Sequence, residues 1–171
     1  MASDLRPIMG GGATGLWLQS CMPERSLPDP VATRRLGASL ADLAREGDVI
    51  ALHGDLGLGK TELARGFIQR LAGPDTEVPS PTFNLVLTYD TPLAMVWHFD
   101  LYRVERQAEL AELGLEDAFA SGISLVEWPE RLGGELPAEA LNVRLTTSGA
   151  GRIAAIEGGG TWPARLDMLP A

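Results

Sequence analysis

Hydrophobic positions in the first half of the chain follow a helix–strand–helix order. Between Pro30 and Gly47, apolar side chains recur at three- and four-residue intervals with charges between them, which predicts an amphipathic helix. Val49–Leu52 is a continuous apolar run with glycine near either end, a pattern typical of a buried strand. Helical spacing returns from Lys60 to Leu71, and Gly73-Pro74 predicts the end of that second helix.

The second half of the chain is predicted to consist mainly of strands. Strands are expected over Asn84–Tyr89, Leu93–Leu101, Ile123–Val126, Leu141–Thr147 and Arg152–Glu157, and short helices over Arg106–Leu113 and Leu115–Ala120. A further short strand is predicted near the start of the chain, at Leu16–Gln19. Each proline of Pro79-Ser80-Pro81 disfavours the helical region for the residue before it, so this segment is expected to be extended.

Length and composition indicate one globular domain. The chain has 171 residues, of which 45% are hydrophobic and 22% charged, enough to bury a core without covalent cross-links. Cys21 stands alone, which excludes an intrachain disulfide framework and a cysteine-rich zinc site. No apolar run approaches a membrane span, and the first residues lack the apolar core of a secretory signal, so we expect a cytoplasmic protein without membrane contact. We expect a loose tail over residues 1–15, the domain over 16–157 and a poorly ordered C-terminal tail over 158–171.

The formal net charge of −9 argues against a protein that binds nucleic acid by itself, because such proteins take most of their affinity from Lys and Arg on phosphates. The charge is uneven: residues 104–139 hold nine acidic side chains against Arg106 and Arg131. A solvated helical face is the favoured interpretation, and a patch that meets a basic partner is the alternative. The chain has thirteen arginines and a single lysine, Lys60.

That lysine lies in the segment that carries the chemistry, Gly54–Thr61, which matches G-x-x-x-x-G-K-[ST]. The glycines let the backbone curl so that its N–H groups point at phosphate oxygens, and the following helix N-terminus adds free N–H groups. Lys60 is expected on the β- and γ-phosphates, and Thr61 offers a hydroxyl to Mg²⁺. The predicted phosphate-binding residues are Asp55, Leu56, Gly57, Leu58, Gly59, Lys60 and Thr61.

A phosphate loop works with an acidic residue that helps to hold Mg²⁺ from the end of a neighbouring strand. Glu127 directly follows Ile123–Val126, and Asp100 ends the run Met95–Phe99. We favour Glu127 as the metal ligand because its run is the more continuous. Asp100 is expected near the γ-phosphate or the attacking water, and the choice between the two for direct metal contact stays open.

Three further residues near these blocks have simpler interpretations beside functional ones. Thr82 follows a proline-fixed bend, where a hydroxyl could sense the γ-phosphate as switch loops do, and a simple turn is the alternative. Trp128 and His98 are expected to have packing roles.

Four blocks stand out together: Gly54–Thr61, Ser80–Phe83, His98–Arg103 and Val126–Glu130. In their order and spacing they resemble the TsaE (YjeE) family, small bacterial P-loop ATPases of tRNA threonylcarbamoyladenosine synthesis. The resemblance covers residues 16–157. It implies a compact α/β, P-loop NTPase-like domain with a central mixed β-sheet flanked by helices.

The resemblance also implies an activity and partners. The protein would bind and hydrolyse ATP to ADP with Mg²⁺ in an assembly with TsaD and TsaB, which transfer the threonylcarbamoyl group to a tRNA adenosine. It would support turnover of that complex, would not perform the transfer itself and would meet tRNA only through the complex. Arg103 and the acidic stretch 104–139 are candidate docking surfaces.

By the family pattern, each block has a role at the site. Thr61 and Glu127 would be Mg²⁺ ligands, and Lys60 would hold phosphates. Asp100 would lie by the nucleotide, and Ser80–Thr82 would be a switch-like loop. The resemblance thus implies four catalytic residues, which are Lys60, Thr82, Asp100 and Glu127. Gly151 and Arg152 resemble a family position near the nucleotide, and the adenine would lie near Pro30.

Two other functions remain open from the residues alone. A small-molecule kinase uses the same loop, but such enzymes usually need several arginines in a lid, and residues 104–139 are nearly free of arginine. A nucleotide-sensing module without catalysis is the second alternative, since the sequence shows no evident water-positioning glutamine or arginine finger.

Overall fold

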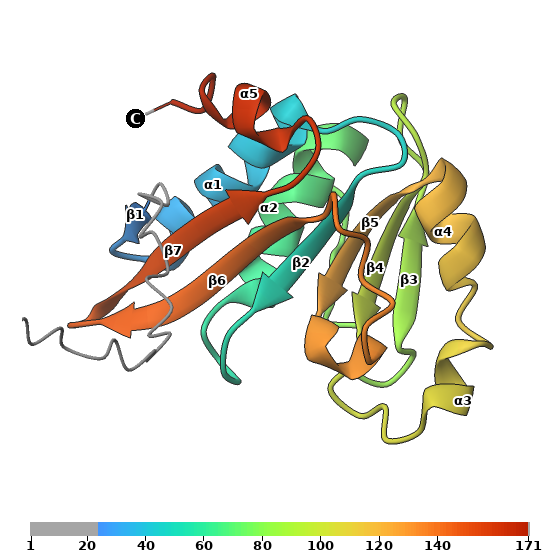
Figure 1. The fold of residues 1–171 in the computed structure, drawn as a ribbon. Coiled ribbons are helices and arrows are strands. Elements are labelled where there is room, and N and C mark those ends of the chain that lie inside the picture. Colours follow the sequence, from blue (N-terminus) through green and yellow to red (C-terminus); the bar gives the residue numbers. More distant parts are fainter. Residues whose placement is uncertain (1–23, 171) are drawn as a thin grey trace, which may run out of the picture.

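Seven strands form one mixed sheet at the centre of the computed structural model, which describes residues 24–170 (Figure 1). The strands are β1 (Glu24–Leu27), β2 (Val49–His53), β3 (Val86–Tyr89), β4 (Val96–Asp100), β5 (Ile123–Glu127), β6 (Leu141–Ser148) and β7 (Gly151–Gly158). The helices are α1 (Pro30–Leu43), α2 (Lys60–Ala72), α3 (Gln107–Leu110), α4 (Leu115–Ser121) and α5 (Trp162–Leu166), with a 3₁₀ turn η1 (Pro129–Leu132). The predicted α/β class with a central mixed sheet is confirmed.

The order of the strands across the sheet is β1-β7-β6-β2-β5-β4-β3. The four central strands β6, β2, β5 and β4 are parallel, whereas β1, β7 and β3 pair antiparallel at the two sides. Parallel strands end at the same edge of a sheet, so the segments that follow β2, β4 and β5 meet there. This lower edge in Figure 1 is where the sequence motifs converge.

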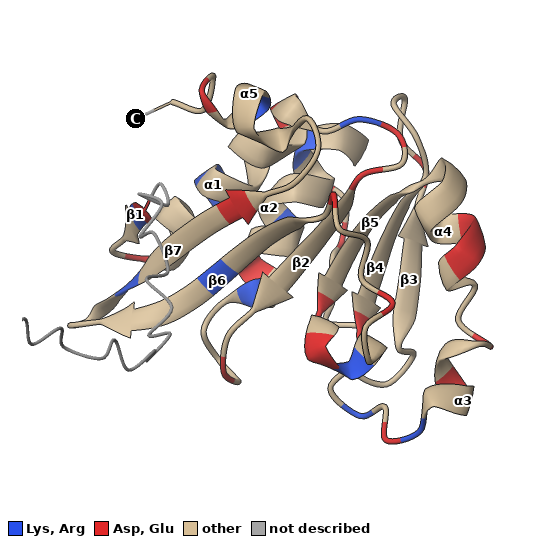
Figure 2. Ribbon diagram, in the orientation of Figure 1, with Lys and Arg blue, Asp and Glu red and all other residues tan. Residues whose placement is uncertain are grey.

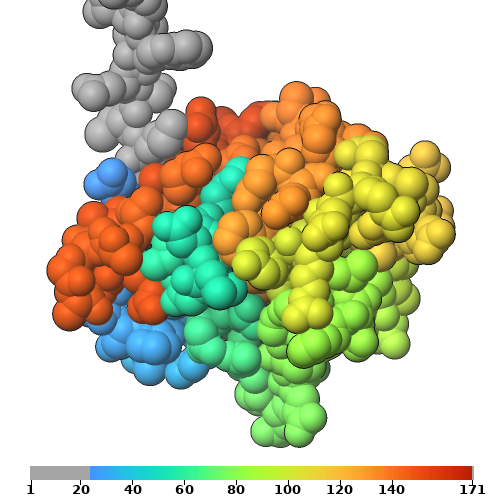
Figure 3. Space-filling model, turned by 90° about the horizontal axis from the view of Figure 1, so that it is seen from below, coloured from blue at the N-terminus to red at the C-terminus, as the bar shows by residue number. Residues whose placement is uncertain are grey.

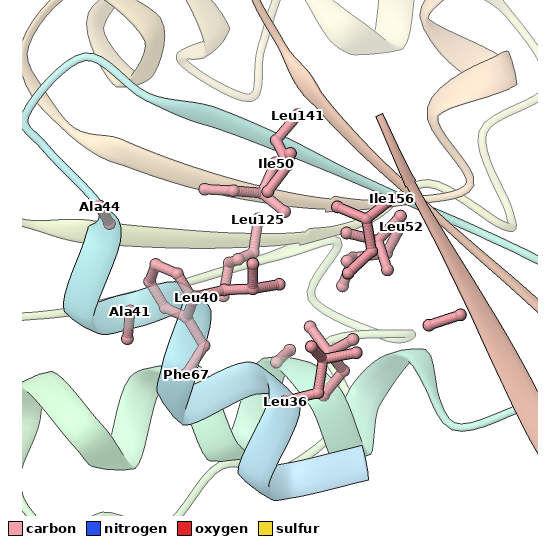
Figure 4. Packing of buried hydrophobic residues seen from close by; sticks show 14 of the residues in the cluster. Leu36, Leu40, Ala41, Ala44, Ile50, Leu52, Phe67, Leu125, Leu141 and Ile156 are labelled. Carbon is pink, nitrogen blue, oxygen red and sulfur yellow. The ribbon is translucent and has the colours of Figure 1, made fainter. Parts of the chain in front are cut away.

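One face of the sheet is covered by α1 and α2, which pack against each other and against the apolar side chains of the central strands (Figure 4). Leu40 of α1, Phe67 of α2 and Ile50 of β2 are fully buried in this cluster. The two helices lie very close because Gly37 and Gly66 lack side chains: a Cβ at Gly37 would collide with the Leu63 carbonyl. This contact fixes α2, and with it the phosphate loop, on the sheet.

The opposite face carries a second, smaller cluster beneath α3, α4 and η1. Phe99 and Val126 point into it from β4 and β5, and Leu110 and Ala118 close it from the helices. The central strands are therefore buried on both sides, which explains their continuous apolar runs. Within the described residues, no helix is long and apolar enough to cross a membrane.

Most predicted elements are present, with shifted ends. The helix α1 begins where expected, with the Asp29 carboxylate accepting a bond from the Ala32 N–H at 2.8 Å, but it ends at Leu43, before Gly47. The strand β4 begins at Val96, not Leu93, because the Thr91 hydroxyl donates to the Ala94 carbonyl at 2.6 Å and prolongs the turn.

Two regions differ from the sequence prediction. The strand β1 pairs with β7 at the sheet edge and was not expected, while the predicted strand Leu16–Gln19 and the predicted tail 1–15 lie outside the described residues. The expectation of a poorly ordered tail after Gly158 was wrong for the helix α5. Trp162 of this helix is 1% exposed and packs into the main core, and the Arg165 guanidinium forms an ion pair with Asp48 at 2.6 Å.

Candidate nucleotide-binding site

The loop Gly54–Gly59 joins β2 to α2 at the lower edge of the sheet (Figure 1). Gly59 immediately precedes α2 with φ +101°, a conformation that side chains other than glycine rarely adopt, and its carbonyl accepts the Leu63 N–H at 2.9 Å. The N-terminus of α2 therefore opens directly onto the loop. Free N–H groups and the positive end of the helix dipole make this a site suited to phosphate.

The Lys60 side chain lies back along the inside of this loop. Its Nζ donates to the Gly54 carbonyl at 2.6 Å and to the Asp55 carbonyl at 3.0 Å, and it lies 4.0 Å from the centre of the Trp128 ring. Burial lowers the pKa of Lys60 below its usual value, and the negative charge of nearby carboxylates, Glu127 first, partly opposes that shift. Lys60 is thus a buried cation at the N-terminus of α2.

Two buried carboxylates face the loop from neighbouring strands. Asp100 ends β4 and Glu127 ends β5, and the two residues are direct partners in the parallel register. They are 4% and 3% exposed. The red ends of these strands in Figure 2 mark their common edge with the loop. Buried carboxylates are rare unless they are paired or bind a cation, so this pair points to a site.

Glu127 is held by hydrogen bonds at one oxygen only. Its Oε1 accepts the Thr61 hydroxyl at 2.9 Å and is 2.9 Å from Nε2 of His98, a residue that is fully buried in β4. Among residues 24–170, no donor reaches the other oxygen, Oε2. The hydroxyl of Thr61 and the free edge of Glu127 are both hard oxygen donors, the type that Mg²⁺ prefers.

Asp100 is tied to the Ser80–Thr82 segment. Its Oδ2 accepts the Thr82 hydroxyl at 2.7 Å and the Ser80 hydroxyl at 3.3 Å, and its Oδ1 accepts the Tyr102 N–H at 3.1 Å. The two hydroxyl oxygens are 2.6 Å apart. A carboxylate at the end of β4 therefore positions the segment that the sequence identified as switch-like.

These groups line a single cleft of about 440 Å³. Its walls come from the phosphate loop with the first turn of α2, from Ser80 and Thr82, from the segment after β4, and from Glu127 with Trp128. Viewed from below in Figure 3, the loop lies beside the segments that follow β4 and β5. Cofactor clefts typically span a few hundred cubic ångströms, so this volume suits a nucleotide.

Comparison with known proteins agrees with this geometry. A family model described as "Threonylcarbamoyl adenosine biosynthesis protein TsaE" matches residues 27–154. The chain belongs to the TsaE family. The match spans β1 to β7 and includes every block described above, and it gives this chain a family role in tRNA threonylcarbamoyladenosine biosynthesis.

Individual TsaE relatives are similar over most of the domain. The protein named TsaE in Rickettsia bellii is 39% identical over 113 residues, which is 66% of this chain and 78% of that protein. The TsaE protein of Bacillus subtilis is 37% identical over 122 residues, covering 71% of this chain and 75% of the relative. The crystal structure of Bacillus subtilis YdiB matches with a TM-score of 0.73 at 28% identity, over 86% of this chain and 93% of that one.

In this TsaE chain, the structure brings most of the predicted site residues together. Leu56, Gly57, Gly59, Lys60, Thr61, Thr82, Asp100 and Glu127 line the cleft. Asp55 and Leu58 face the β6 side of the loop, where they border a smaller hollow with Leu145. Their predicted phosphate contact is through backbone N–H groups and stays a prediction.

The predicted pair Gly151 and Arg152 at the start of β7 lies outside the cleft walls. Arg152 nevertheless reaches the phosphate loop, since its Nη2 donates to the Gly57 carbonyl at 3.1 Å. Gly151 lies against the Leu27 carbonyl of β1. Pro30, the position where the family pattern places the adenine, begins α1 and does not line the cleft, so contact with the base stays a prediction.

Sequence reasoning missed two site residues by assigning them to packing. His98 contacts the predicted metal ligand Glu127, and Trp128 forms part of the cleft wall beside Lys60. Trp128 has φ +61°, which is uncommon for a bulky residue and turns the chain abruptly from β5 into η1. Alternation along β4 offered the signal for His98, since it is two residues from Asp100 and thus on the same face of the strand.

The donor set fits a metal held partly by the nucleotide. Within the described part of the chain, no group of three or more His, Cys, Asp or Glu residues forms a complete metal cage. Mg²⁺ in nucleotide sites characteristically uses one or two protein oxygens together with phosphates and water. Thr61 and Glu127 supply that number.

Proposed function

We propose that this chain binds ATP with Mg²⁺ in the cleft and hydrolyses ATP in support of the TsaB–TsaD complex of tRNA threonylcarbamoyladenosine synthesis. One observation carries the proposal: the phosphate loop, with Lys60 and Thr61, faces two buried carboxylates from the adjacent parallel strands β4 and β5. This is the arrangement that P-loop NTPases require for phosphate and magnesium together.

In the proposed complex, loop N–H groups hold the phosphates and Lys60 leaves the loop carbonyls for the β- and γ-phosphates. This exchange is favourable because phosphate oxygens are charged acceptors, whereas the Gly54 and Asp55 carbonyls are neutral. Thr61 and Glu127 would hold Mg²⁺, which when bound would supply positive charge that offsets the charge of the phosphates. His98 keeps the Glu127 carboxylate in place for this role.

Asp100 and Thr82 are proposed to act at the γ-phosphate end of the cleft. The Thr82 and Ser80 hydroxyls now bond to Asp100, and both can turn toward a phosphate oxygen or an attacking water. Nucleotide contact would thereby change the position of the Ser80–Thr82 segment. Such a loop can report the bound nucleotide to a partner protein.

The partner assignment is supported by family membership and by surface character. Leu56 of the loop and Phe83 beside Thr82 are 74% and 83% exposed, so both large apolar side chains are available for contact with a partner protein. The net charge of −9 agrees with contact to tRNA only through the complex. We propose that the threonylcarbamoyl transfer itself takes place on the partners.

The acidic stretch 104–139 offers a second docking surface, although its acidic side chains have different surroundings in the structure. Glu127 is buried in the cleft and Glu109 pairs with Arg106 at 2.8 Å, while the remaining members include Glu116 and Asp117 on α4 (Figure 2). Charge reversal at Glu109 and Glu112 is expected to weaken association with TsaB–TsaD. Unchanged association and unchanged ATP turnover would reject this surface.

The deciding experiment measures phosphate release from ATP by the wild type and by Lys60→Ala, each alone and with TsaB–TsaD. We expect turnover that requires Mg²⁺, rises with the partners and is lost in Lys60→Ala. Phosphate release without any added acceptor would separate an ATPase from a kinase. If Lys60→Ala turned over ATP at the full wild-type rate, the site assignment would be rejected. If the wild type bound ATP tightly but showed no turnover under any condition, the protein would be a nucleotide-sensing module without catalysis.

A further inference from the structure

Two cations line the cleft, and only one of them belongs to the phosphate loop. Lys60 is held by loop carbonyls, whereas Arg103 lies on the segment that follows β4, three residues after Asp100. The Arg103 guanidinium lies 4.6 Å from the centre of the Phe83 ring. Since Phe83 follows Thr82, this contact joins the two segments that carry Asp100 and Thr82.

Arg103 has no carboxylate partner within the described residues. Two other arginines near the site, Arg34 and Arg65, share the Glu62 carboxylate of α2, and Arg152 donates to the Gly57 carbonyl of the phosphate loop. Arg103 instead rests on a ring that is 83% exposed, and contacts of this kind at exposed sites are weak. The charge of Arg103 is therefore available to a ligand in the cleft with little loss of existing interactions.

We propose that Arg103 is an arginine finger supplied by the chain itself, which moves from Phe83 onto the terminal phosphate of ATP. The inference rests on the proposed ATPase function. In that reaction a water oxygen forms a bond to the γ-phosphorus while the bond from this phosphorus to the bridging β–γ oxygen breaks. ADP leaves with the electron pair of that bond, and the proton lost by the water ends on inorganic phosphate.

Negative charge builds on the γ-phosphoryl and bridging oxygens during this step, and a planar guanidinium can bind two of them at once. Lys60 would reach the transferred group from the phosphate loop and Arg103 from the segment after β4, so two separate segments would each supply a cation. Asp100 and the Thr82 hydroxyl line the same cleft as Arg103, and they are the groups proposed above to meet the attacking water. Arg103 would then be the arginine finger that no sequence pattern revealed.

The test compares Arg103→Ala with the control Arg70→Ala, an exposed arginine of α2 that pairs with Asp42, does not line the cleft and lies outside the stretch 104–139. Arginine fingers contribute about 10³-fold or more to kcat, so Arg103→Ala should lower TsaB–TsaD-supported turnover by about that factor. ADP affinity should stay at the wild-type value, while affinity for ADP with aluminium fluoride and Mg²⁺ should fall. Arg70→Ala should match the wild type in all three measurements.

Two further measurements separate catalysis from a structural or docking role. Phe83→Ala should bind ADP with aluminium fluoride and Mg²⁺ as tightly as the wild type, because the ring holds the guanidinium only when no nucleotide is bound. Arg103→Ala should still bind TsaB–TsaD in a sedimentation assay. Wild-type turnover in Arg103→Ala, equal losses of ADP and aluminium fluoride binding, or loss of partner binding would each overturn the role of Arg103 alone. A wild type that hydrolyses no ATP with its partners present would overturn the proposed function as well.

Discussion

Removal of the Asp48 carboxylate is expected to destabilise the whole domain through a residue far away in the sequence. Asp48 lies just before β2, and its two oxygens accept from Nη1 and Nη2 of Arg165 at 2.6 and 2.8 Å. The Arg165 guanidinium also donates to the Leu43 carbonyl at 2.9 Å and lies 3.7 Å from the centre of the Trp162 ring. Arg165 is 4% exposed, so Asp48→Ala leaves a buried charge without its partner.

The size of this effect follows from that burial. Breaking a buried ion pair by removing one partner lowers the free energy of unfolding by about 3–5 kcal/mol. For a domain of this length each kcal/mol shifts Tm by about 2–4 °C, so Asp48→Ala should lower Tm by about 6–20 °C. The matched control is Asp42→Ala, which breaks the exposed pair with Arg70, whose side chains are 52% and 55% exposed. Exposed pairs contribute about 0–1 kcal/mol, so the control should shift Tm by a few degrees at most.

Thermal and urea unfolding of both variants measure the difference directly. Adding Arg165→Met to Asp48→Ala should recover part of the loss, because the apolar side chain removes the uncompensated charge. If Asp48→Ala is no more destabilising than Asp42→Ala, the Asp48–Arg165 pair does not stabilise the folded domain in the way that its burial predicts. A double variant that is less stable than Asp48→Ala would show that the unpaired charge was not the cause.

Two predictions concern the cleft. A lysine-selective reagent should modify the folded domain only at Lys60, and ATP–Mg²⁺ should protect this residue. The rate of modification should reach half its maximum below the ordinary pKa of lysine, because burial favours the neutral amine. Peptide mapping across a pH series that showed an ordinary lysine titration, or no protection by ATP–Mg²⁺, would refute this prediction. His98→Ala should weaken Mg²⁺-dependent nucleotide binding by about 10–100-fold, because Glu127 loses its orienting partner, whereas His98→Gln, which keeps a donor, should retain more affinity. Equal nucleotide titrations for the two variants would contradict that role.

The parts of the site that depend on residues adjacent in the sequence were predictable from the sequence. The loop Gly54–Thr61, the strand before it and the helix after it follow from local preferences, and all three lie where they were expected. The carboxylates Asp100 and Glu127 were identifiable because each ends an apolar run. What no local pattern contained was that β4 and β5 are neighbours in register, which makes the two carboxylates partners.

Errors of prediction arose where a residue's role depends on what packs against it. In the sequence, Trp128 and His98 look like ordinary core residues. Only the packing of β4, β5 and α2 against one another places Trp128 beside Lys60 and His98 beside Glu127. The segment after Gly158 is rich in glycine and proline, which predicted poor order. Burial of Trp162 and the pairing of Arg165 with Asp48 override that local preference.

Lys60, the single lysine beside thirteen arginines, shows what the sequence determined and what the tertiary structure determined. By itself, the sequence determined that Lys60 sits in a phosphate loop, because the loop is built from consecutive residues whose conformation depends on local glycines and a helix start. Only the tertiary structure decided how the cleft closes around it, since Asp100 and Arg103 come from the end of β4, and Glu127 and Trp128 from the end of β5. Those positions depend on strand order and on the close packing of α1 with α2, which are properties of the whole core.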